Sequence, residues 1–174
     1  MSRKTRVITL SALFAALSVI SLYVASIWPT GRFGLVAFSS LFVAAAVCET
    51  GLVSGLYVFI ITSALGMLIL PDKSAPLLYT LFFGYYPVVK SLVERIRSRV
   101  AQWILKLLVF NASLLVIWFF FRTLVFGVDF ETVTVLLVYI GCNIIFVIFD
   151  YGFSKVIGFY LDRISGRTGN RPQR

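Results

Sequence analysis

Hydrophobic positions along the chain fall into six long runs, which short polar or turn-forming segments separate. About 20 apolar residues in a helix cover the hydrocarbon layer of a bilayer, so each run is predicted to be a membrane-spanning helix. The six predicted helices cover residues 7–28, 33–48, 52–70, 77–95, 101–124 and 132–161. They form one domain over residues 1–165, and we expect residues 166–174 to be a flexible basic tail.

Turn-forming residues mark the breaks between these runs. Residues 29–32 and 71–76 contain the prolines and the glycine that typically end a helix. The break at residues 49–51 is much shorter, and two helices joined this tightly must form an antiparallel hairpin, unless the apolar stretch is interrupted elsewhere. Inside the fourth run, Pro87 removes a backbone hydrogen bond and is expected to kink the helix.

The composition agrees with a membrane protein. Hydrophobic residues make up 60% of the 174 positions and charged residues 13%. Soluble domains contain about 45–50% apolar and about 25% charged residues. A water-soluble core cannot absorb this excess, so the predicted fold class is an all-α integral membrane protein, a six-transmembrane-helix bundle.

The distribution of positive charge predicts the orientation. The chain has 16 Lys and Arg against 7 Asp and Glu, a formal charge of +9. With six spans and a cytoplasmic N-terminus, 13 of the 16 basic residues fall on the cytoplasmic side, as the positive-inside rule requires. Five spans would place the two ends on opposite sides and remove this bias. We therefore expect both termini in the cytoplasm, a location in the cell membrane, and contacts of the basic residues with anionic lipid rather than nucleic acid.

Small residues identify two candidate helix contacts. Ala12 and Ala16 lie one turn apart on the first helix, and small residues let membrane helices approach closely. Packing inside this bundle and docking on a partner are both open for this pair. For Gly51 and Gly55, which form a GxxxG pattern, we expect packing inside the bundle.

Four polar residues at membrane depth need partners. Charges in the bilayer are costly, so Lys90 and Asp150 are predicted either to pair or to lie separately at the inner interface, in preference to a transport or relay role. Asn111 and Asn143 fall near the midplane, and either amide can satisfy the other.

Recognisable catalytic patterns are missing from the sequence. The chain has no histidine, and Cys48 and Cys142 have no CxxC spacing, so both are interpreted as free thiols. HExxH, GxSxG and P-loop patterns do not occur. We therefore expect no enzyme activity, no cofactor and no metal, and any ATP-driven work would need another subunit.

Residues 3–17 and 149–155 resemble a known family. The first segment has basic residues followed by a helix with Ala12 and Ala16, and the second belongs to the last helix. Both are similar to the corresponding segments of S components, the substrate-binding membrane subunits of energy-coupling factor (ECF) importers. The resemblance implies a vitamin or other micronutrient as substrate. It also implies that Ala12 and Ala16 dock on a transmembrane coupling subunit, which in turn binds two ATPase subunits.

The resemblance further implies a substrate pocket that opens outward. It would lie at the outer ends of the later helices, under the first outer loop. Aromatic rings there would sandwich a planar ligand and an arginine would hold an anionic group. The candidate residues are Trp28, Arg32, Tyr79, Tyr86, Trp118, Arg122, Tyr139 and Asn143.

Two other functions are compatible with the sequence. The first is a structural membrane protein of the cell envelope, similar to the MreD family of cell-shape factors. The second is a membrane enzyme acting on lipid-linked substrates, whose turnover would depend on Asp150 or Lys90. The lack of histidine and of clustered acidic residues makes the enzyme the weakest of the three.

Overall fold

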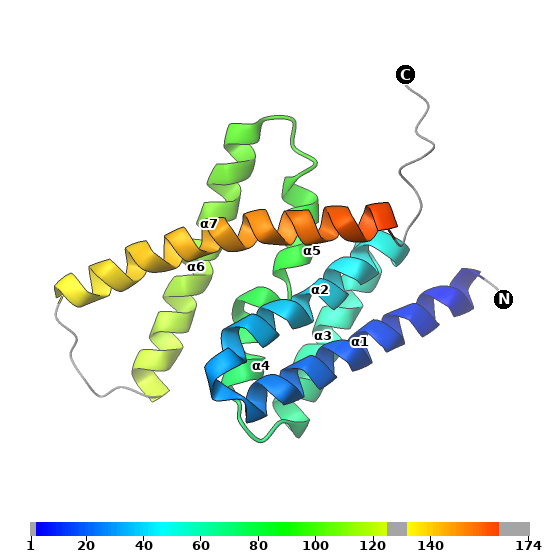
Figure 1. Cartoon of the computed structure of the whole chain (residues 1–174), viewed down its shortest axis with the longest axis horizontal. Coiled ribbons are helices and arrows are strands. Elements are labelled where there is room, and N and C mark those ends of the chain that lie inside the picture. The colour runs from blue at the N-terminus through cyan, green and yellow to red at the C-terminus, as the bar shows by residue number, and fades with distance from the viewer. Residues whose placement is uncertain (1–2, 125–131, 164–174) are drawn as a thin grey trace.

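The computed structural model describes residues 3–124 and 132–163, and these residues form an all-helical structure (Figure 1). The long helices are α1 (Arg3–Ile27), α2 (Arg32–Thr50), α3 (Leu52–Ile69), α6 (Arg99–Leu124) and α7 (Thr132–Arg163). The short elements are a 3-10 turn (Pro29–Gly31), α4 (Ser74–Leu78), a π-helical segment (Tyr79–Phe83) and α5 (Tyr86–Val93). Within these described residues, five helices are long and apolar enough to cross a membrane, which indicates a multi-pass membrane protein. The predicted tail at 166–174 lies outside the described residues.

The segment predicted as one helix at 77–95 is divided in the structure. The Gly84 N–H donates to the Tyr79 carbonyl at 2.7 Å, a π-type bond, and α5 then begins anew at Tyr86. Pro87 falls in the first turn of α5, where its missing N–H leaves no helical bond unmade. A Cβ on Gly84 would lie 2.6 Å from the rings of both Phe59 and Tyr79, so only glycine fits there. Where the sequence predicted a kinked helix at Pro87, the structure ends one helical segment at Phe83 and begins another at Tyr86.

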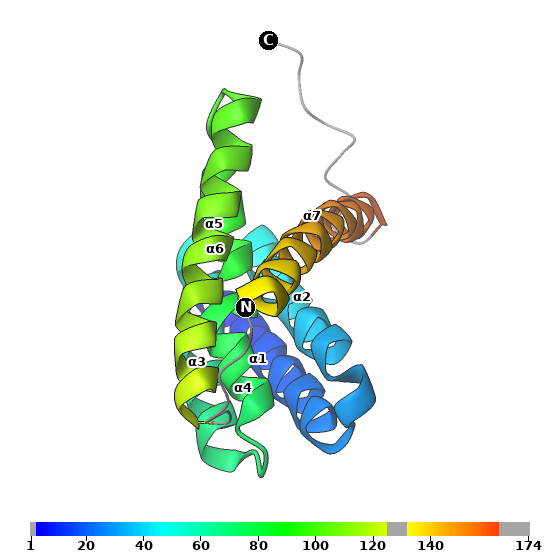
Figure 2. The same ribbon diagram turned by 90° about the vertical axis from the view of Figure 1, so that its left-hand side faces the viewer.

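Helices α1, α2 and α3 build the main hydrophobic core (Figures 1 and 2). The buried positions of α1 follow one helical face, because their spacing of three or four residues places them on the same side. Most of them are small, which lets the three helices pack closely. On α1 they are Ala15, Ser18, Leu22 and Ala25; Val36, Val43 and Ala46 of α2 and Val58 of α3 face them.

The tight hairpin predicted at residues 49–51 is confirmed. Gly51 has a φ of +102°, in the region that favours glycine, and reverses the chain between α2 and α3. A Cβ on Gly55 would come within 2.3 Å of Val47 Cγ2. The second glycine of the GxxxG pattern therefore packs against α2, and both glycines act inside this chain.

Helices α6 and α7 meet over a short stretch rather than along their length, as the crossing in Figure 1 shows. Phe110 and Phe146 stack with ring centroids 4.3 Å apart at the crossing. These rings extend a second hydrophobic cluster around Phe82 and Tyr86. The C-terminal end of α7 lies near the α2–α3 hairpin (Figure 1). There Glu49, at the end of α2, contacts Arg6 of α1 and Tyr160 of α7.

Gly55→Ala tests the close approach of α2 and α3. We expect it to destabilise the chain by about 1–3 kcal/mol, because the new methyl group overlaps Val47. Val47→Ala in the same chain should recover part of the loss. The measurement is thermal unfolding in detergent. Gly158→Ala is the control, since nothing lies within 4 Å of its added Cβ. Equal effects at the two glycines would contradict the packing described.

Candidate functional site

Three charged side chains are almost fully buried between apolar helices. Lys90 is 2% exposed, Lys106 5% and Asp150 2%. An isolated charge at such a position costs several kcal/mol, so its partners decide whether the fold is stable. A fourth charged residue, Glu94, contacts the two lysines; it follows the end of α5 and its side chain is 43% exposed.

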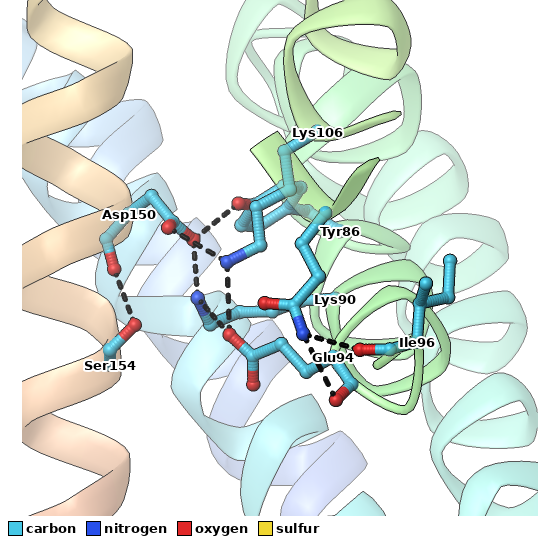
Figure 3. Close-up of polar contacts among 8 residues, drawn as sticks. Tyr86, Lys90, Glu94, Ile96, Lys106, Asp150 and Ser154 are labelled. Atoms are coloured by element: carbon cyan, nitrogen blue, oxygen red, sulfur yellow. Dashed lines mark hydrogen bonds and ion pairs between the residues drawn. The ribbon is translucent and has the colours of Figure 1, made fainter. Parts of the chain in front are cut away.

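These four residues form a closed ion ring in which lysines and carboxylates alternate (Figure 3). Lys106 Nζ lies 2.9 Å from Asp150 Oδ2 and 2.9 Å from Glu94 Oε1. Lys90 Nζ lies 2.8 Å from Glu94 Oε1 and also contacts Asp150 Oδ1. The Tyr86 hydroxyl donates to the same Asp150 oxygen. We call Lys90, Glu94, Lys106 and Asp150 the ion ring.

The members of the ring come from three helices. Tyr86, Lys90 and Glu94 recur every four residues, so they share one face of α5 and its C-terminal end. Lys106 comes from the second turn of α6, and Asp150 from the middle of α7. The ring therefore joins α5, α6 and α7 at one point.

The structure brings Lys90 and Asp150 together, the first of the two arrangements that the sequence left open. Sequence reasoning missed that Tyr86, Glu94 and Lys106 belong to the same cluster. The four-residue spacing of Tyr86, Lys90 and Glu94 on α5 could have indicated the first two. The sequence holds no signal for the direction of α6, which brings Lys106 to Asp150.

The ring is balanced in charge, with two cations and two carboxylates. Asp150 accepts three hydrogen bonds from side chains, so its charge is well satisfied. Such a cluster fixes the relative positions of the three helices. Among the described residues, no group of three Cys, Asp or Glu side chains is placed to hold a metal ion.

Asn111 and Asn143 satisfy each other, as predicted. Their amides exchange reciprocal hydrogen bonds of 3.1 and 3.2 Å where α6 crosses α7. Each amide also donates to a carbonyl one turn earlier in its own helix. Beside this pair lies an open hollow of about 380 Å³, lined by Leu107, Asn111, Tyr139, Ile140, Asn143, Ile144 and Val147.

The eight predicted substrate-binding residues occupy several separate environments. Tyr139 and Asn143 line the hollow together. Tyr86 contacts the ion ring, and the buried hydroxyl of Tyr79 accepts a 3.4 Å hydrogen bond from Ser18. Trp28, directly after α1, and Trp118 on α6 are exposed. Arg32 pairs with Asp72 at a separate place, and the side chain of Arg122 lies outside the described residues. The described side chains thus do not form one pocket from this set.

Arg32, Asp72 and Ser74 form a polar contact, which we call the latch, at the end of the three-helix core away from the α2–α3 hairpin. The Arg32 guanidinium lies 2.5 Å from Asp72 Oδ2 and donates to the Ser74 hydroxyl. Asp72 also accepts the backbone N–H of Ser74 at 2.9 Å. Partial burial alone would raise the pKa of Asp72, but the hydrogen bonds from Ser74 and the charge of Arg32 outweigh it and lower that pKa.

The predicted docking residues Ala12 and Ala16 are exposed on α1. Ala15 and Ser18 lie on the side of α1 that is buried against the neighbouring helices. The exposed side of α1 continues through Ile8 and Ile20, which are 69% and 58% exposed. The two alanines therefore leave a shallow, small-residue strip between larger apolar side chains, which we call the α1 strip.

Comparisons with family models, with curated proteins and with solved structures give no match for this chain.

Lys106→Met tests whether the ion ring stabilises the fold. Removing one cation leaves two carboxylates around a single lysine, so we expect a loss of about 3–5 kcal/mol. Lys106→Met combined with Asp150→Asn should lose about 1–3 kcal/mol less than the sum of the single changes. Detergent unfolding measures all three. Lys155→Met, at an exposed lysine above the Tyr151 ring, is the control with little expected effect. Strictly additive losses would contradict a coupled ring.

Asp72→Asn tests the latch through its pH dependence. Because the folded-state pKa of Asp72 is lowered, its contribution to stability is present above the ordinary carboxyl range, about pH 4, and is lost as the pH falls through the lowered value. The natural chain should therefore exceed Asp72→Asn in stability at pH 7, and the difference should shrink as the pH falls through the acid range below about pH 4. Unfolding curves at pH 7 and across the acid range decide this, and a constant difference would refute it.

Proposed function

We propose that this chain is a non-catalytic, substrate-binding membrane subunit of an ATP-driven importer, similar to an ECF S component. It would bind a vitamin or other micronutrient and dock on a transmembrane coupling subunit, with two ATPase subunits completing the complex. The observation that carries the proposal is the exposure of Ala12 and Ala16 on α1. These are the positions at which the resemblance to S components places the contact with the coupling subunit.

The physical argument for docking rests on what α1 presents on its two sides. Its buried side is already used by α2 and α3, so the α1 strip is free to accept another helix. Small residues on a membrane helix allow a partner backbone to approach closely, and dispersion contacts then replace those with lipid. The flanking Ile8 and Ile20 would bracket such a helix.

Six spans with both ends in the cytoplasm are compatible with these elements. Residues 74–93, although interrupted, are about as long as the ~20 residues needed to cross the hydrocarbon layer. Counting this segment with the five long helices gives six spans. The start of α1, the α2–α3 hairpin, the α5–α6 turn and the end of α7 would then face the cytoplasm, where most of the basic residues lie.

The hollow beside Asn143 is the best current candidate for substrate contact. It combines an aromatic ring, two amides and an apolar wall, which is the usual mixture in small-molecule sites. If it belongs to the substrate site, changing Tyr139 and Asn143, the two predicted residues that line it, together to alanine should abolish ligand binding. Unchanged binding by this double variant would remove the hollow from the proposal.

A structural role in a cell-envelope complex is the second candidate. The observation in its favour is that the described members of the predicted pocket are spread over separate environments. A scaffold of the MreD-like type would use its outer helix faces and would need no pocket. It predicts a stable protein partner without a small ligand.

Ala12→Trp with Ala16→Trp tests the docking proposal. Two indole rings would fill the α1 strip, so co-purification of a coupling subunit and ATPases from the native membrane should fall at least about tenfold, while unfolding stays unchanged. Mass spectrometry of a mild-detergent pull-down measures the recovery. Ala64→Trp with Ala112→Trp, at exposed alanines of α3 and α6, is the matched control.

The identity of the recovered proteins separates the two candidates. An ATPase pair with a second membrane subunit, lost only in the α1 variant, supports the importer. Recovery of cell-wall or cytoskeletal proteins with no ATPase would refute the importer and favour the scaffold. Equal losses in the α1 variant and its control would refute docking through the α1 strip.

A further inference from the structure

The members of the ion ring differ sharply in how deeply they are held. The side chains of Lys90, Lys106 and Asp150 are between 3% and 6% exposed, whereas that of Glu94 is 43% exposed. Lys90, Lys106 and Asp150 alone carry one net positive charge. Glu94 neutralises it from the solvent side.

Glu94 is also the least firmly bound member. One of its oxygens, Oε1, takes both lysine contacts, whereas Asp150 uses both of its oxygens and accepts from Tyr86 as well. Glu94 begins the turn between α5 and α6, and residues 94–100 are exposed throughout. The Glu94 carboxylate thus covers the ammonium groups of Lys90 and Lys106, which converge on one of its oxygens.

The segment that follows Glu94 is rich in positive charge. Arg95, Arg97 and Arg99 follow directly in the exposed turn. Gln102 donates to the Ile96 carbonyl at 2.7 Å and holds this turn against the start of α6. The ring and this turn therefore carry five cationic side chains, Lys90, Lys106 and the three arginines, against two carboxylates.

We propose that Lys90 and Lys106 form a binding site for a phosphate-type anion, and that the Glu94 carboxylate occupies this site when the anion is absent. A phosphate oxygen placed where Glu94 Oε1 lies would accept charge-assisted hydrogen bonds from both lysines. Asp150 and Tyr86 stay in place and hold the lysines ready. The phosphate belongs either to a free anion or to an anionic lipid headgroup. This site is separate from the α1 strip and does not depend on the proposed importer function.

The test uses the full chain in a neutral detergent at constant ionic strength. Its probes are inorganic phosphate and short-chain phosphatidylglycerol, with short-chain phosphatidylcholine as the uncharged reference. Ligand-dependent shifts of the unfolding midpoint give an apparent Kd for each probe. Glu94→Gln removes the competing charge, and Glu49→Gln is the matched control, because Glu49 is a carboxylate paired with Arg6 and Tyr160 away from the ring.

We expect Glu94→Gln to tighten binding of at least one phosphate probe by about tenfold or more, with no change in Glu49→Gln. Adding Lys106→Gln to Glu94→Gln should cancel the gain. Tightening for both probes identifies a site open to free phosphate, and tightening for phosphatidylglycerol alone identifies a lipid headgroup site.

Three results would overturn the proposal: no gain in Glu94→Gln, an equal gain in Glu49→Gln, or a gain that survives loss of Lys106. If Glu94→Gln does not fold, Glu94→Asp replaces it. Its shorter side chain cannot bridge both lysines as well, so a smaller gain in the same direction is expected. Unchanged binding in Glu94→Asp would then overturn the proposal.

Discussion

The need to neutralise charge inside an apolar structure is the constraint on which the second half of this fold depends. Lys90, Lys106 and Asp150 are buried where water cannot solvate them, and none could remain charged there alone. The ion ring satisfies all three at once, which requires α5, α6 and α7 to meet at one point. The contact between α6 and α7 is otherwise short, so the ring and the neighbouring Phe110–Phe146 stack determine where the two helices cross.

The break between α4 and α5 makes this meeting possible. In a regular helix, Tyr79 and Tyr86 would lie seven residues apart on the same face. In the structure they serve different partners: Tyr79 faces Ser18 in the core of α1–α3, and Tyr86 faces Asp150 on α7. The π-type turn and Gly84 separate the two directions. One segment of sequence thus contributes to both hydrophobic clusters.

Features that depend on local spacing could be predicted from the sequence, and features that depend on helix direction could not. The all-helical class, the hairpin at Gly51 and the Asn111–Asn143 pair follow from run length, turn residues and depth along a helix. Lys106 was missed because no spacing reveals that α6 brings its second turn to Asp150, whereas the four-residue spacing of Lys90 and Glu94 on α5 was an available signal. The eight predicted substrate residues were chosen by depth and residue type, but α6 crosses α7, so equal depth does not imply proximity (Figure 1). Arg32 pairs instead with Asp72, in the connection between α3 and α4.

The arrangement of contacts also separates the two surfaces proposed to bind other molecules. The principal contacts of α1 are with α2, α3 and α4, whereas the ion ring belongs to α5, α6 and α7. Helix α2 contacts both groups, so it is the main physical connection between the α1 strip and the ring. Coupling between distant sites requires an element that both sites bias. An anion that displaced Glu94 would first release the α5–α6 turn, which lies away from the principal contacts of α1. Binding at the ring and docking at α1 are therefore expected to be independent unless α2 itself moves.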